Sequence, residues 1–139
     1  MPGGAVLEEN RIFIGGSGDG IRPWDIDDSF HYAFQEIQGN GEIRAKLEDI
    51  REGDGNGATG IMIRESTDEG SKYVGILFRE GYVLLIQHRE ETDGASWATV
   101  MTSQPIQLPC RLRLVREGDT IIGNYGTDGI NWMGGNLRT

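Results

Sequence analysis

Apolar and polar residues alternate along short stretches of this chain, and tight turns separate the stretches. The pattern is clearest at residues 42–48, where Ile43, Ala45 and Leu47 fall on one face of an extended strand. The charged residues between them fall on the opposite face. A period of two predicts an antiparallel strand that buries one face in a core and exposes the other to solvent.

The same pattern recurs at intervals that are typical of all-β proteins. Further strands are predicted at residues 11–14, 30–35, 60–64, 73–78, 82–89, 97–101, 110–116 and 120–125. Glycine accounts for 22 of the 139 residues and is spread along the chain, which favours many tight turns. The Asp-Gly pair at 128–129 adds a strong hairpin signal before Trp132. The sequence therefore predicts one all-β domain over residues 1–139, folded as a two-sheet antiparallel β-sandwich.

Charge and hydropathy narrow the partners that such a domain can bind. The net charge of −9 disfavours nucleic acid and anionic membranes, because their phosphates would be repelled. The longest apolar run, residues 82–86, has strand length and is far shorter than the roughly 18 residues of a membrane helix. Residues 1–4 have neither the basic nor the apolar region of a signal peptide. We therefore expect no nucleic-acid partner and no membrane partner.

Cys110 is the single cysteine, so it cannot form a disulfide within the chain. It alternates in phase with Leu112 and Leu114. We expect it to be a buried apolar residue rather than a nucleophile.

Three blocks of sequence, in order, carry a family resemblance. They are GSGDGI (16–21) with DSFHYAFQEIQGNGEIRAKL (28–47), then GIMIRES (60–66), then RLRLVREGDTIIGNYGTDGINW (111–132). The chain resembles the concanavalin A-like (laminin G-like jelly-roll) domains of the DUF1349 type. Such domains are found beside bacterial glycoside hydrolases and in secreted or surface proteins. The resemblance implies a jelly-roll sandwich, an extracellular or cell-surface location and a role near carbohydrate.

The family continues beyond the last block with a further strand, whereas this chain ends at Thr139. The resemblance therefore implies that the terminal strand of the family is lacking. A missing strand leaves an open sheet edge, and open edges pair with other chains. We expect a homo-oligomer that forms through such an edge.

Carbohydrate binding uses exposed aromatic planes beside planar polar groups. The residues that could supply them are Trp24, Tyr82, Trp97, Arg64, Arg89 and Arg113. The arginines alternate with apolar residues, so several of them could line one sheet face. The alternative is structural: Trp97 and Trp132 would pack in the core or on a hairpin. The arginines would then pair with Glu42, Glu48 and Glu65 across strands.

An acidic cluster follows Trp24. Asp25, Asp27 and Asp28 could supply carboxylate oxygens to Ca²⁺, which prefers oxygen ligands. Turn and capping chemistry is the alternative explanation, because aspartate side chains often hydrogen-bond nearby backbone groups. The sequence leaves both open.

Glycoside hydrolysis needs two carboxyl groups that flank one bond, about 5–10 Å apart. The glucanases of this fold class place them with a Glu-x-Asp-x-x-Glu strand, and the nearest match here is residues 48–52 (EDIRE). Glu48 and Asp49 would face opposite sides, and Glu48 and Glu52 would lie about 13 Å apart along a strand. The sequence therefore predicts a non-catalytic binding or interaction module for polysaccharide or oligosaccharide. A glycoside hydrolase-like enzyme and a structural subunit that assembles through sheet edges are the alternatives.

Overall fold

The computed structural model describes residues 3–8, 11–16, 36, 38–48, 59–79, 83–102 and 104–138. Within these ranges the regular elements are all β-strands, and they pair antiparallel throughout. This part of the chain contains no helix that is long and apolar enough to cross a membrane. The predicted all-β class with antiparallel sheets is confirmed.

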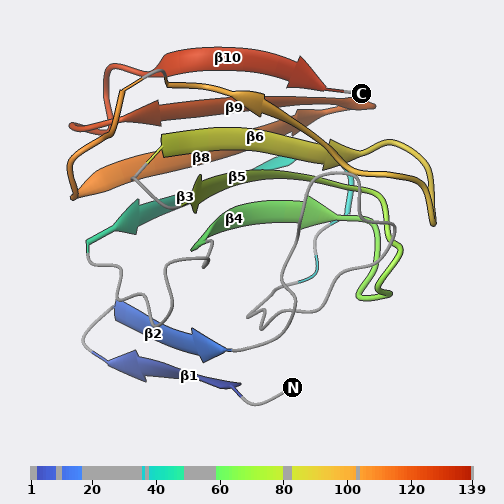
Figure 1. Cartoon of the computed structure of the whole chain (residues 1–139), viewed down its shortest axis with the longest axis horizontal. Helices are drawn as coiled ribbons and strands as arrows, with labels where there is room; N and C mark the ends of the chain where they lie inside the picture. The colour runs from blue at the N-terminus through green and yellow to red at the C-terminus, as the bar shows by residue number, and fades with distance from the viewer. Residues whose placement is uncertain are drawn as a thin grey trace.

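Two four-stranded sheets form the body of the molecule (Figure 1). The first, called the β5 sheet, has the order β4 (Thr59–Arg64), β5 (Tyr73–Arg79), β6 (Val83–Arg89) and β7 (Trp97–Val100). The second, called the β8 sheet, has the order β10 (Met133–Arg138), β9 (Thr120–Gly126), β8 (Cys110–Glu117) and β3 (Gly41–Leu47). A separate hairpin of β1 (Gly3–Glu8) and β2 (Arg11–Gly16) lies on the side of β3 and β4, away from β10 (Figure 1).

Each strand that the alternation predicts within the described residues is present, with ends that differ by at most two residues. The strand predicted at 30–35 lies outside the described residues. Two strands, β1 and β10, are additional to the prediction. The arrangement is that of a β-sandwich, because β4 and β5 of one sheet contact β8 of the other.

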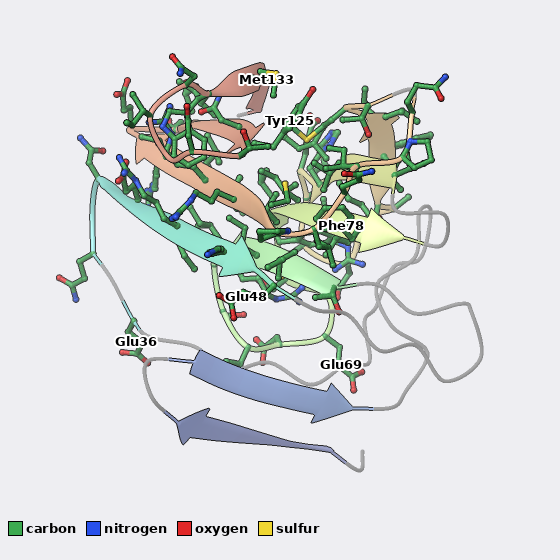
Figure 2. The ribbon with its side chains drawn as sticks, turned by 90° about the vertical axis from the view of Figure 1, so that its left-hand side faces the viewer. Glu36, Glu48, Glu69, Phe78, Tyr125 and Met133 are labelled. Carbon is green, nitrogen blue, oxygen red and sulfur yellow. The ribbon has the colours of Figure 1, made fainter. Side chains whose placement is uncertain are left out.

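The core lies between the two sheets. Its buried apolar side chains are Ile61, Val74, Ile76, Phe78, Leu84, Ile86, Cys110, Leu112 and Leu114. Phe78 of β5 and Tyr125 of β9 reach it from opposite sheets (Figure 2). In β8 the buried residues alternate with partly exposed ones, as the period of two requires. Of the three residues of β3 predicted to face inward, Ala45 and Leu47 pack against the same core, whereas Ile43 is 37% exposed.

Cys110 is part of this core, as predicted. It is 1% exposed and is a free thiol. Desolvation by burial raises the pKa of the thiol above its ordinary value. A buried, protonated thiol is a poor nucleophile, so Cys110 serves packing.

Gly123 of β9 lets the sheets approach at the centre of the sandwich. A Cβ atom at this position would lie 2.9 Å from Cδ1 of Ile86 and 3.1 Å from Cδ1 of Ile76. The two isoleucine methyl groups therefore occupy the space in which any other residue would place its side chain. Interiors are close-packed, so this contact ties the two sheets together.

Candidate functional site

Arginines follow the outer face of β8, the face that points away from the core. Arg111 and Arg113 alternate with buried residues and so project outward. The register of β3 against β8 places Arg44 opposite Arg113 and Lys46 opposite Arg111. Residues directly opposite across an antiparallel pair share a face. Four cationic side chains therefore gather on the outer face of the β8 sheet.

The indole of Trp132 lies on the same face. Its ring centroid is 4.6 Å from Cζ of Arg113 and 5.5 Å from Cζ of Arg44, which are cation–π distances. A Cβ at Gly126 of β9 would lie 3.7 Å from Cε3 of the indole, so the ring rests close to the strand backbone. Trp132 is nevertheless partly exposed. We call this surface, made of Arg44, Lys46, Arg111, Arg113, Asn124 and Trp132, the basic face.

A tight turn after β9 positions Trp132. Oδ1 of Asp128 accepts hydrogen bonds from the backbone N–H groups of Ile130 and Asn131, both at 2.8 Å. Oδ2 accepts a third from Nδ2 of Asn131 at 2.8 Å. The hydrogen bonds from the Asn131 and Ile130 backbones hold the pKa of Asp128 below its ordinary value. Gly129 has a positive φ of 74°, as the predicted Asp-Gly turn requires.

The cations of β3 have acidic partners on the same strand or directly after it. Nε of Arg44 lies 2.5 Å from Oε1 of Glu42, and Nζ of Lys46 lies 3.5 Å from Oε1 of Glu48. All four of these side chains are well exposed to solvent. The charge that β3 brings to the basic face is therefore balanced locally.

Arg111 and Arg113 of β8 have no such partner among the described residues. Nε and Nη2 of Arg113 donate to the neutral Oδ1 of Asn124, at 3.2 and 2.9 Å. Nε of Arg111 is enclosed and has no hydrogen-bond partner. Its side chain runs beside Gly129, where a Cβ would lie 3.3 Å from Cδ of Arg111. Among the described residues no carboxylate forms an ion pair with Arg111 or Arg113.

Two of the predicted sugar-binding residues, Arg64 and Arg89, come together on the outer face of the other sheet. Tyr73 stands between them, since it pairs with Arg64 on β4 and with Arg89 on β6. The two guanidinium carbons each lie 5.2 Å from the centroid of the Tyr73 ring. Tyr73 is 3% exposed and Arg89 is 1% exposed.

These two arginines hold loops in place. Arg89 donates to the backbone carbonyls of Gly94 at 2.8 Å, Ser71 at 3.1 Å and Glu69 at 3.2 Å. Arg64 donates from Nη2 to the carbonyl of Asp68 at 2.8 Å. The backbone carbonyls of the 65–72 and 90–96 loops thereby gain hydrogen-bond donors at one end of the β5 sheet.

The hydroxyl of Tyr73 belongs to a buried cluster of hydrogen-bonded polar side chains beside these loops. It accepts from Nε2 of Gln87 at 2.9 Å and donates to Oγ of Ser96 at 3.0 Å. Gln87 and Ser96 are both 0% exposed. The polar atoms of this part of the β5 sheet hydrogen-bond to one another, so these side chains stabilise the fold rather than offer groups to a ligand.

The remaining predicted site residues lie elsewhere. Trp97 begins the edge strand β7, opposite His88, and is 61% exposed, so the alternative that places it in the core is wrong. Arg113 lies on the outer face of the β8 sheet, away from Arg64 and Arg89. Trp24, Tyr82 and the predicted calcium ligands Asp25, Asp27 and Asp28 lie outside the described residues.

Arg44, Lys46, Arg111 and Trp132 belong to the basic face but were not predicted as site residues. The alternation in β3 and β8 places each cation on an outer face. It does not show that these two strands, far apart in the chain, are neighbours. Trp132 was expected to pack on a hairpin, and it does lie directly after the turn, against the sheet rather than in the core.

The basic face can bind anions and offer an aromatic plane. In the described part of the chain no group of three or more His, Cys, Asp or Glu side chains is arranged to hold a metal ion. A scan against protein-family models, a search of curated proteins and a search of solved structures each found no match to this chain.

Proposed function

We propose that this protein is a non-catalytic carbohydrate-binding module with a jelly-roll sandwich of the concanavalin A-like, DUF1349 type. Two stacked four-stranded antiparallel sheets support the fold part of this proposal. The observation that supports the function is the partly exposed indole of Trp132, over whose ring the guanidinium groups of Arg44 and Arg113 lie. An aromatic plane beside convergent polar groups is suited to the apolar face and the hydroxyls of a sugar ring.

The indole is fixed before any ligand arrives. The Asp128 turn sets the backbone just before Trp132, and the Arg44 and Arg113 guanidinium groups contact its ring. A group that is already ordered loses little conformational entropy on binding. Lys46 and the arginines supply N–H donors for sugar hydroxyls around this plane.

Among the described acids beside the basic face, Glu42 and Glu48 are placed for ion pairs rather than for catalysis. Glu42 and Glu48 each pair with a cation of β3. Six residues of extended strand separate their backbones by about 20 Å. Glycosidase carboxyl groups must lie within about 10 Å of each other. This separation supports the non-catalytic form of the proposal.

Replacing Trp132 by alanine is expected to weaken sugar binding by at least about tenfold, because the stacking plane is lost. Isothermal titration against a panel of soluble polysaccharides would measure the effect. Trp97→Ala is the matched control, since Trp97 lies at the edge of the other sheet and should leave the affinity unchanged. Absence of binding by the unchanged protein to every polysaccharide would contradict the proposal, as would equal losses in both variants.

The edge strand β7 favours a second candidate function, that of a structural subunit. Its four residues are exposed, including Trp97 at 61% and Val100 at 57%. It contains no charge and no proline, which natural edge strands use to prevent pairing. An antiparallel partner strand from a second copy, related by a two-fold axis perpendicular to the sheet, would pair with the exposed edge of β7.

In that case the protein is expected to form dimers whose fraction rises with concentration. Val100→Lys should return it to a monomer, because a charge on the edge opposes strand pairing. Sedimentation velocity over a concentration series would measure both. Ile130→Lys is the control, since Ile130 is 80% exposed and lies in the turn after β9. A monomer at all concentrations would exclude assembly through β7.

A further inference from the structure

We propose that the basic face recognises an anionic sugar, a uronate-containing polysaccharide whose carboxylate binds at Arg111 and Arg113. This inference rests on the proposed function and names its substrate class. Three features of the described residues support it: the grouping of like charges, the lack of acidic partners on β8, and the position of Trp132 beside Arg113.

The grouping of cations on the basic face does not stabilise the fold by itself. Arg44 stands directly opposite Arg113, and Lys46 stands directly opposite Arg111. Like charges in directly opposite positions destabilise a sheet. The chain as a whole carries a net charge of −9, so acidic residues that could separate these cations are abundant in its sequence. Glu42 and Glu48 offset the charges of β3, and an anion bound at the face would offset those of β8.

The β8 arginines are the part of the face that remains unbalanced. Glu42 and Glu48 neutralise the two cations of β3. The nearest turn also contains an acid, Asp128, whose oxygens accept hydrogen bonds from Ile130 and Asn131. Among the described residues it forms no ion pair with either arginine. Arg111 makes no hydrogen bond through Nε, and Arg113 bonds only a neutral amide oxygen. In the described part of the chain, neither of these two positive charges is therefore in an ion pair with a carboxylate.

The chemistry of guanidinium groups favours a carboxylate ligand. Arg111 and Arg113 are two residues apart on one strand, so their Cα atoms are about 7 Å apart on the same face. A planar guanidinium presents parallel N–H donors that match the two oxygens of a carboxylate. Two such guanidinium groups side by side can both donate hydrogen bonds to one carboxylate.

Trp132 links the anion to a sugar ring. Its ring centroid is only 4.6 Å from the guanidinium carbon of Arg113. A pyranose that stacks on the indole would direct a ring carboxylate toward the β8 arginines. A neutral sugar would gain the stacking but would leave both charges unpaired. The arrangement thus discriminates in favour of uronates.

The basic face covers a small area, which favours binding of a uronate chain over a nucleic acid. Electrostatic attraction at physiological salt acts over about 8 Å, so a local cluster of cations can bind an anion on an acidic protein. Duplex nucleic acid carries a charge about every 1.7 Å along its axis and would extend over the acidic remainder of the surface. A uronate polymer with spaced carboxylates makes fewer unfavourable contacts.

The test compares uronate oligosaccharides with their carboxyl-reduced, neutral counterparts on the full chain by isothermal titration. We expect the uronate form to bind at least about tenfold more tightly, with an affinity that falls as salt is raised. Arg111→Gln and Arg113→Gln should each remove most of this preference, whereas Arg113→Lys should retain part of it. The control is Arg116→Gln, because Arg116 lies on β8 in phase with Leu114, on the opposite face.

The outcomes separate the two proposals. Equal binding of uronate and neutral forms overturns the uronate assignment and leaves carbohydrate binding in place. Binding of neither form nor any other saccharide overturns both. Tighter binding to a DNA oligonucleotide than to every uronate overturns the assignment in favour of nucleic acid. The comparison of ligands on the unchanged protein needs no variant, so a variant that fails to fold does not affect it.

Discussion

Replacing Arg89 by alanine is expected to lower the free energy of unfolding by about 3–5 kcal/mol. Arg89 is 1% exposed, and its guanidinium donates to the carbonyls of Glu69, Ser71 and Gly94. Alanine would leave these acceptors without their donors, and Ser71, which supplies one of them, is 2% exposed. It would also remove the cation that stacks on Tyr73 and would open a void beside that ring.

Urea denaturation monitored by tryptophan fluorescence would measure the Arg89 effect. Arg64→Ala is the matched control, because Arg64 stacks on the other side of the Tyr73 ring but is partly exposed. We expect it to lower the free energy of unfolding by only about 1 kcal/mol. Arg89→Lys should also destabilise, since an ammonium cannot reproduce the planar arrangement of donors. A change below about 1 kcal/mol for Arg89→Ala would show that the loops are held by other contacts.

Replacing Ile86 by alanine is expected to destabilise the protein by about 2–5 kcal/mol, toward the upper end of that range. Ile86 is 0% exposed at the centre of β6 and packs against the core. The cost of such a change depends on how far the surroundings can collapse into the void. Across the sandwich stands Gly123, which has no side chain that could move into the vacated space.

Equilibrium denaturation of Ile86→Ala and Ile86→Val would test this expectation. The valine variant removes only the terminal methyl group and should cost about 0.5–1.5 kcal/mol. Ile130→Ala provides the surface control, because Ile130 is 80% exposed and its change should stay within about 0.5 kcal/mol. If Ile86→Ala matched the surface control, the packing described for the two sheets would be wrong.

Alternation was sufficient to predict most of the strands. In β3 and β8 the period of two correctly assigned the strand, and it assigned the buried face correctly except at Ile43, which is 37% exposed. It failed for β10, because Met133 is followed by two glycines and an asparagine, which are poor strand formers. That segment is extended because it pairs with β9, with a register shift between Gly134 and Asn136. Tertiary context therefore overrides local preference there. Figure 2 shows Met133 on this strand beside Tyr125, its partner on β9.

The candidate site was predictable only in part. Sequence alternation shows which side of its own strand Arg113 occupies, but not which strand lies next to it. The pairing of Arg44 with Arg113 joins residues that are far apart in the chain, so the basic face emerges only from the register. Arg64 and Arg89 share a face of one sheet, whereas Arg113, the third arginine of the predicted set, lies on the other sheet. Their bonds to loop carbonyls depend on the conformation of the 65–72 and 90–96 loops, which the residue types do not specify.

The contact between Gly123 and the isoleucine methyl groups implies that these positions cannot vary independently. Alanine at 123 would compete with Cδ1 of Ile86 for the same volume, and valine is the residue that lacks that atom. Relatives of this chain that carry alanine on the β9 side should therefore carry a shorter aliphatic residue on the β6 side. Positions 123 and 86 lie on strands of different sheets and fill the same part of the interior. A larger side chain at one position therefore requires a smaller one at the other.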